Sequence, residues 1–157
     1  VKNPVVLVLD SVMDPHNIGA CLRTANAAGI KTVIAPKDNA GDLTATAIKV
    51  ASGAAPYIEW VKVANLARSL RFLQQQGYWL VGLAGEVSES LYDLDVDRPL
   101  AVVMGQEGAG MRLKTKQLCD YLVHIPQYGQ VESLNVSVAT GVCLFEIMRK
   151  RASLQVG

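Results

Sequence analysis

The chain has 157 residues, half of them apolar, and its 15 Lys and Arg residues nearly balance 14 Asp and Glu residues for a net charge of +1. This length suits one domain with one sizeable core, and the apolar content excludes a disordered chain. The charge balance argues neither for nor against a nucleic-acid partner. A small nucleic-acid-binding module usually has a larger excess of basic residues, whereas an enzyme needs only a local basic patch.

Cysteine, histidine and hydropathy patterns exclude several further classes. The cysteines are widely spaced with no CxxC, which predicts reduced core thiols of a cytoplasmic protein at Cys21, Cys119 and Cys143. Only His16 and His124 could be imidazole ligands, and no metal-ligand spacing is present, so we expect no metal. No apolar stretch reaches the ~18 residues that a membrane span needs, and no signal peptide opens the chain.

The first elements follow in chain order from a β-branched run. Residues 5–9 (VVLVL) predict a buried strand, and a polar loop over 10–17 follows it. Residues 18–28 are rich in Ala and Leu and predict a helix, with Asn17 as its cap and Gly29 as its end.

Strands then alternate with helices along the rest of the chain. Further strands are expected over 31–35, 57–61, 78–84, 100–104 and 122–125. Helices are expected over 43–51, 66–76, 114–120 and 134–151. This alternation predicts a single-domain α/β fold, with a mainly parallel sheet flanked by helices.

Three polar or glycine-rich loops follow strands and run towards helices. They cover residues 14–19, 105–110 and 127–135. Ligands of open parallel sheets bind beyond the carboxyl ends of the strands, so we expect the site where these loops converge. The first strand is not followed by GxGxxG, which disfavours an ordinary dinucleotide-binding site.

Each candidate residue in these segments has a structural alternative. Residues 105–110 predict either a tight turn that needs positive φ or a close approach of backbone to a ligand, with Glu107 presented beside it. Arg23 is either a solvated helical charge or, because small residues surround it, a cation that reaches a phosphate or an oxyanion. Ser133 and Asn135 either cap the last helix or face a substrate.

These segments together resemble the motifs of the SpoU family of SPOUT methyltransferases. The matching stretches are residues 14–25 (DPHNIGACLRTA), 102–110 (VVMGQEGAG), and 125–126 followed by 133–139 (SLNVSVA). Their order and spacing fit along nearly the whole chain. One of these motifs alone is weak, whereas the set of three is a strong signal.

The resemblance implies a fold and an assembly that composition does not. It implies an α/β domain whose C-terminal part is threaded into a trefoil knot, a rare exception to the rule against knots. It also implies that the loops of the knot hold S-adenosylmethionine in a bent shape and that the domain is a homodimer. Relatives often carry an N-terminal RNA-binding domain. Because the chain starts at Val1, we expect residues 1–157 to be the catalytic domain without that segment.

The resemblance also implies roles for particular residues. The substrate and catalytic positions of the family correspond to Asn17, Arg23, Glu107, Ser133 and Asn135. The cofactor-lining positions correspond to Gly105, Ile125 and Leu134.

The implied activity is methyl transfer from S-adenosylmethionine to the ribose 2′-hydroxyl of a guanosine in structured RNA. Within the family the chain looks most similar to enzymes that act on large-subunit (23S) ribosomal RNA. The tRNA guanosine enzymes are the nearest competitors. A non-catalytic RNA-binding module of the same fold is the alternative from another class, and it predicts loss of Arg23 or of the cofactor pocket. An α/β enzyme for another nucleotide is disfavoured because no P-loop is present.

The chemistry of an arginine limits its role. Family proposals make it the general base, but lowering a guanidinium pKa from above ~12 to about 7 costs about 7 kcal/mol. A helix N-terminus supplies only ~1–2 kcal/mol of that cost. We therefore interpret Arg23 as a cation that stabilises the developing alkoxide, while the identity of the base stays open.

Overall fold

The computed structural model describes residues 3–37, 43–106 and 108–156. Within them the chain forms a six-stranded sheet in the order β3-β2-β1-β5-β4-β6, in which every pair of neighbours is parallel. The strands are β1 (Val5–Leu9), β2 (Thr32–Pro36), β3 (Glu59–Val63), β4 (Trp79–Leu83), β5 (Leu100–Met104) and β6 (Tyr121–Val123). The predicted α/β class with a mainly parallel sheet is confirmed.

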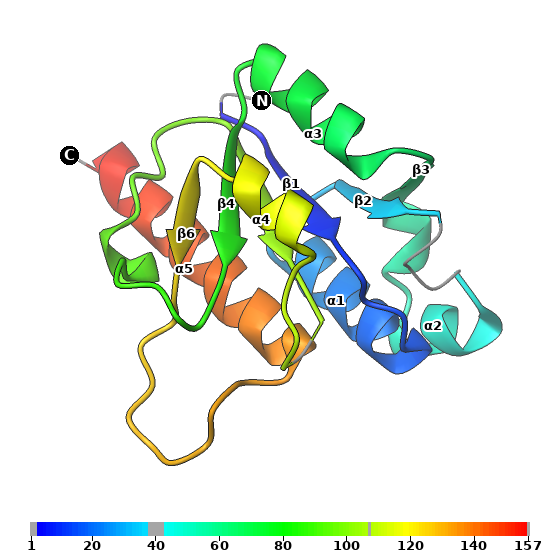
Figure 1. Ribbon diagram of the computed structural model, residues 1–157. Coiled ribbons are helices and arrows are strands. Elements are labelled where there is room, and N and C mark those ends of the chain that lie inside the picture. The colour runs from blue at the N-terminus through cyan, green and yellow to red at the C-terminus, as the bar shows by residue number, and fades with distance from the viewer. Residues whose placement is uncertain (1–2, 38–42, 107, 157) are drawn as a thin grey trace.

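Helices cover both faces of this sheet (Figure 1). They are α1 (Pro15–Ala27), α2 (Ala45–Val50), α3 (Leu66–Gln75), α4 (Leu113–Leu118) and α5 (Val136–Val156), with short 3₁₀ turns at Ala55–Tyr57 and Leu91–Asp93. Successive strand residues point to opposite faces. Leu7 and Leu9 therefore pack in the core with α1 and α5, while Val6 and Val8 pack in a second core with α3 and α4.

The first helix begins earlier than the sequence predicts. Asp14 is its N-cap and accepts a hydrogen bond from the His16 amide at 2.8 Å, with Pro15 in the first turn. The expectation that Asn17 caps this helix is wrong, because Asp14 followed by Pro is a complete start signal of its own. Asn17 instead lies inside the first turn, and its side chain is available for a tertiary contact.

The last helix begins later than predicted and its cap is one of the two candidates. Asn135 precedes α5, and its side-chain oxygen accepts from the Ser137 amide at 2.8 Å. Ser133 and Leu134 thus lie in the preceding loop. The third predicted strand also starts two residues late, because Pro56 lies in a 3₁₀ turn that displaces it.

The segment between β4 and β5, residues 84–99, forms hydrogen bonds with the C-terminal elements, and we call this segment the clasp. Its Glu89 carbonyl accepts from the His124 amide at 2.9 Å, and the His124 carbonyl accepts from the Leu91 amide at 2.8 Å. Arg151 of α5 donates to the carbonyls of Val96 at 3.0 Å and Arg98 at 2.7 Å. This long connection therefore holds β6 and α5 against the sheet.

Candidate functional site

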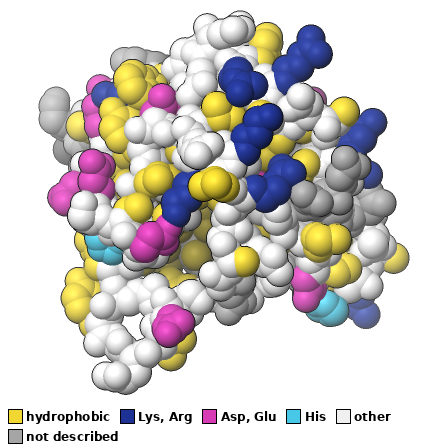
Figure 2. Space-filling model, viewed as in Figure 1, with side chains coloured by type: hydrophobic (Ala, Val, Ile, Leu, Met, Phe, Trp, Pro, Cys, Tyr) yellow, Lys and Arg dark blue, Asp and Glu magenta, His cyan; other side chains and the backbone are white. Residues whose placement is uncertain are grey.

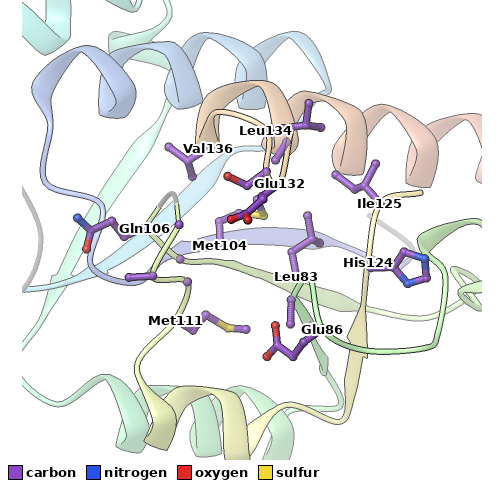
Figure 3. A pocket seen from close by; sticks show the side chains of 18 of the residues that line it. Leu83, Glu86, Met104, Gln106, Met111, His124, Ile125, Glu132, Leu134 and Val136 are labelled. Carbon is purple, nitrogen blue, oxygen red and sulfur yellow. The ribbon is translucent and has the colours of Figure 1, made fainter. Parts of the chain in front are cut away.

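A cavity of about 610 Å³ opens beyond the carboxyl ends of β4, β5 and β6. The connections that follow these strands line it, together with the residues that lead into α5. Figure 3 shows side chains from these separate segments facing a common space. The lining includes Leu83–Glu86, Met104–Gln106, Gly108–Met111, Lys116, His124–Gln127, Val131–Leu134, Val136 and Ala139.

Apolar side chains form one part of the cavity lining, and glycine residues contribute main-chain atoms to another part. Leu83, Met104, Ile125, Leu134 and Val136 contribute hydrocarbon side chains (Figure 3). Gly105, Gly108 and Gly110 of the loop after β5 also line the cavity, and they contribute only main-chain atoms because they carry no side chain. Such a lining accepts a flat apolar ring and satisfies the ring's polar edge without charged side chains.

The loop after β5 is a tight turn closed on itself. The Gln106 and Gly110 backbones exchange two hydrogen bonds, of 3.2 and 2.7 Å. Gly108 and Gly110 have φ values of 80° and 74°, which bear out the predicted need for positive φ. At Gly105 a Cβ would lie 2.1 Å from the Met111 amide nitrogen, so only glycine fits there.

Two anchors hold the far end of this loop. The Met111 side chain lies over Gly82 of β4, where an added Cβ would come within 2.6 Å of the Met111 methyl carbon. Arg112 donates to the Asp10 carboxylate from its amide at 3.0 Å and from its Nε at 2.8 Å. Asp10 is completely buried at the end of β1. The sequence analysis assigned no role to Asp10, although a carboxylate directly after a buried strand was a usable signal.

The structure joins the first and third motifs through an asparagine pair. Asn135 Nδ2 donates to Asn17 Oδ1 at 3.1 Å, which links the first turn of α1 to the cap of α5. The Ser137 hydroxyl also donates to Asn135 Oδ1, at 2.5 Å. Two side chains that are 118 positions apart in sequence are therefore in contact next to the cavity residues Leu134 and Val136.

The predicted site residues fall into three groups. Gly105, Ile125, Ser133 and Leu134 line the cavity, and Asn17 and Asn135 are joined beside it. Arg23 is exposed on α1, about 9 Å further along the helix axis than Asn17, and it does not line the cavity. Glu107 lies outside the described residues.

The small residues around Arg23 have a packing role. A Cβ on Gly19 would lie 2.4 Å from the Ala47 carbonyl oxygen of α2, and Gly141 of α5 approaches Thr24 of α1. These positions let the neighbouring helices come close to α1. The small residues therefore do not by themselves indicate a ligand near Arg23.

The rim of the cavity carries a charged pair that the sequence analysis did not single out. Lys116 of α4 forms an ion pair with Glu86, which follows β4. Both residues line the cavity, and the Glu86 side chain is 64% exposed. Nothing in the local sequence around either residue marked it, because the pair joins segments 30 positions apart.

In the described part of the chain the cysteine thiols are unpaired and protonated, and the candidate metal ligands form no cluster. Burial raises the pKa of the Cys21 thiol to about 11 and that of Cys143 to about 12. Burial, with the charges of Asp120 and Asp10, also raises the pKa of Cys119 to about 12. The expected unpaired thiols are confirmed, and all three are protonated at neutral pH. Within the described residues, no cluster of three or more His, Cys, Asp or Glu side chains could hold a metal ion.

In the part of the chain that the structure describes, no helix combines the length and apolar character that a membrane span requires.

Comparison with known families decides the identity of the fold. Residues 4–145 match the model of the SpoU rRNA Methylase family. The chain belongs to this family. The matched range contains every residue that lines the cavity, from Leu83 to Ala139.

Individual SpoU relatives agree with the match. The chain is 59% identical over 152 residues to the 23S rRNA (guanosine-2'-O-)-methyltransferase RlmB of Pseudomonas aeruginosa, covering 97% of this chain and 61% of that protein. It resembles the SpoU methyltransferase AviRb of Streptomyces viridochromogenes in complex with AdoMet, with a TM-score of 0.90 and 26% identity over 98% of this chain and 62% of AviRb. An AdoMet-bound rRNA methyltransferase of Sinorhizobium meliloti gives a TM-score of 0.88 and 30% identity, over 96% of this chain and 57% of that one. The chain thus spans about three fifths of the length of these relatives.

Proposed function

We propose that this chain binds S-adenosylmethionine in the cavity and transfers its methyl group to the ribose 2′-hydroxyl of a guanosine in large-subunit (23S) ribosomal RNA. The observation that carries the proposal is that the second and third SpoU segments line one cavity, while the first segment is joined to the third beside it through the Asn17–Asn135 hydrogen bond. The RlmB relative, named for this reaction, is 59% identical over nearly the whole chain.

The residues present fit the cofactor. A cavity of about 610 Å³ lies within the range of ~300–1,000 Å³ that holds ligands of this size. The apolar side chains of Ile125 and Leu134 would enclose the adenine, and the main chain around Gly105 would pair with its polar edge. Glu86 and Glu132 on the lining offer carboxylates to a positively charged ligand. When bound, the cofactor supplies an electrophilic methyl group on a sulfonium.

The protein's own residues then align the ribose and assist the loss of the proton from its 2′-hydroxyl. Alignment alone can supply several kcal/mol of rate enhancement. Ser133, on the lining, and the Asn17–Asn135 pair beside it offer hydrogen bonds that orient the ribose. Arg23 stabilises the developing 2′-alkoxide as a cation, and the proton leaves late to phosphate or water. Glu107 is proposed either to orient the Arg23 side chain or to take part in the dimer interface, because it belongs to the second family motif.

A homodimer formed through α1 and α5 is part of the proposal. Val138 and Phe145 of α5 are 52% and 49% exposed, which leaves an apolar strip for a symmetric partner beside α1. The clasp of residues 84–99 around α5 supports the proposed trefoil knot. We place the protein in the cytoplasm with its ribosomal substrate. Light scattering that shows a monomer at micromolar concentration contradicts the dimer.

Labelled methyl transfer tests the activity. The protein is incubated with tritiated S-adenosylmethionine and, in separate reactions, with the rRNA and the tRNA fractions of total RNA, and the labelled nucleotide is mapped. We expect label in the 2′-O-methyl group of one guanosine in 23S rRNA. Label confined to the tRNA fraction supports the tRNA alternative, and no transfer to any fraction supports the non-catalytic module.

Calorimetry with the chain alone tests the cofactor site. We expect binding of S-adenosylmethionine without RNA and without added metal. The absence of binding at millimolar ligand contradicts the proposal at its first step.

A further inference from the structure

Exposed cations gather on the face of the domain that α3 and α4 cover. Figure 2 shows Lys and Arg side chains concentrated over these helices. We define the basic ridge as the cationic residues of α3, of α4 and of the position that caps α4, namely Arg68, Arg71, Arg112, Lys114 and Lys116. The net charge of +1 for the whole chain conceals this concentration.

The helical pattern of α3 directs its arginines outward. Leu66, Ala67 and Leu70 are buried against the sheet, while Arg68 and Arg71 are exposed. Residues three positions apart lie on the same side of a helix, so both guanidinium groups are on one flank. Lys114 is likewise exposed on α4.

Hydrogen bonds make the two helices one continuous surface. Gln74 of α3 donates from Nε2 to the Leu118 carbonyl of α4 at 3.0 Å and to the Asp120 carboxylate at 3.2 Å. The same carboxylate accepts from the Leu80 amide at 2.8 Å. Asp120, the acidic residue closest to the ridge in sequence, thus takes part in hydrogen bonds that hold α3 and α4 together. The spacing between the cations of α3 and α4 is therefore set by the fold.

The ridge ends at the mouth of the cavity. Lys116 lines the cavity, and Arg112 directly follows the glycine loop that forms one of its walls. A chain bound along α3 and α4 is therefore led to the mouth of the cavity, where Arg112 and Lys116 pair with Asp10 and Glu86.

Most acidic side chains lie away from the ridge; the exceptions include Glu86, which pairs with Lys116, and the buried Asp10, which pairs with Arg112. The segment over 84–99 that clasps α5 holds five carboxylates against one arginine; they belong to Glu86, Glu89, Asp93, Asp95 and Asp97. In Figure 2 most of the Asp and Glu side chains are on the left of the molecule, away from the main group of Lys and Arg. This segregation creates a field that draws a polyanion to α3 and α4 and away from the clasp.

We propose that the basic ridge binds the phosphate backbone of the RNA substrate and guides it into the cavity. The inference rests on the proposed function and adds a place where this domain holds RNA. Exposed apolar groups favour RNA over an acidic protein, since Phe72 on α3 and Leu113 at the start of α4 are 58% and 69% exposed beside the cations. An unpaired base can stack on such a phenyl ring.

Salt dependence of RNA binding tests the ridge. The probe is a fluorescein-labelled RNA hairpin of arbitrary sequence, followed by anisotropy between about 50 and 200 mM salt. Each lost phosphate contact lowers the slope of log K against log salt by about 0.7–0.9. We expect the triple variant Arg68→Ala, Arg71→Ala, Lys114→Ala to lose about 2 from that slope and at least tenfold in affinity at the lower salt.

A matched control removes the same charge from other elements. The triple variant Lys31→Ala, Lys49→Ala, Arg149→Ala leaves α3 and α4 intact and is expected to keep the wild-type slope within about 0.5. Equal losses in both triple variants show a non-specific effect of net charge and overturn the ridge. If polyglutamate competes for the wild type but the ridge variant binds RNA normally, the surface serves an acidic protein and the proposal is wrong.

A cofactor readout separates this inference from the proposed function. The exposed ridge residues Arg68, Arg71 and Lys114 do not line the cavity, so the ridge variant should bind S-adenosylmethionine as the wild type does. If the wild type fails to bind the cofactor, the proposed function fails, whatever the RNA data show. If cofactor binding is intact and the RNA slope is unchanged in the ridge variant, only the ridge proposal fails.

Discussion

The cavity and the Arg23 face of α1 differ in how completely one chain builds them. The cavity is lined by loops of a single chain, and the far end of its glycine loop is held by Met111 and by the Asp10–Arg112 pair. Arg23, by contrast, is exposed and lies outside the cavity lining. Because the proposed cofactor residues line the cavity and Arg23 does not, we expect substitutions to separate cofactor binding from methyl transfer.

The largest effect is expected at Arg23. We predict that Arg23→Ala lowers the single-turnover rate of methyl transfer by ~10²–10⁴-fold, as for a lost oxyanion donor, while cofactor affinity stays within a few-fold. Single-turnover assays and calorimetry measure the two quantities. Near-normal transfer by this variant shows that the catalytic centre is misplaced.

The conservative variant at the same position separates two mechanisms. If the arginine is a planar electrostatic clamp, Arg23→Lys fails at every pH. If it is the base, the lysine amine, which loses its proton far more readily, gives appreciable activity above neutral pH. Rates between about pH 6 and 10 distinguish these outcomes, because the deprotonated fraction of a lysine rises steadily towards its ordinary pKa of ~10.4.

The next effect tests whether the cavity is preformed. Gly105→Ala places a methyl group 2.1 Å from the Met111 amide nitrogen and must displace the loop. Overpacking of this kind costs ~1–3 kcal/mol, so cofactor affinity should fall by about 5–150-fold. Gly85→Ala is the control, because Gly85 also lines the cavity and its added Cβ meets no atom within 4 Å. Equal affinities of the two variants, measured by calorimetry, contradict the preformed loop.

A smaller effect is expected at the anchor. Asp10→Asn keeps the shape of the buried side chain but removes the charge that Arg112 contacts. Weakening this hydrogen-bonded pair should lower the free energy of unfolding by ~1–3 kcal/mol and the cofactor affinity by a few-fold. Urea unfolding and calorimetry measure them. The exposed Asp95, paired with Arg98, gives the control Asp95→Asn, which should leave cofactor affinity unchanged. An Asp10→Asn variant that is destabilised but binds normally assigns the pair to folding alone.

The smallest effect is expected at the rim. The Glu86 carboxylate is largely exposed, and pairs of this kind contribute at most ~1 kcal/mol. Glu86→Gln should therefore leave the free energy of unfolding within ~1 kcal/mol of the wild type. A larger loss, seen in urea unfolding, means that the rim is part of the scaffold that holds the cavity.

Local patterns in the sequence predicted most of the fold. The β-branched run at residues 5–9 and the strand at 100–104 match the observed strands, because buried parallel strands require continuous apolar residues. Gly29, with a φ of 84°, follows the C-cap residue Ala28 and terminates helix α1 as expected. Errors occurred at boundaries such as Asn17, where Asp14 and Pro15 a few residues upstream formed the stronger start signal.

The sequence by itself determined the fold class, the glycines of the loop after β5, and the segments that belong to the site, because these depend on hydropathy and on backbone conformation over a few residues. Only the tertiary structure decided that Asn135 contacts Asn17, that Asp10 holds Arg112, and that Arg23 lies outside the cavity. The Asp10–Arg112 contact joins residues 102 positions apart. Such contacts depend on the order of strands in the sheet and on how helices pack across it, and no local pattern encodes either of these.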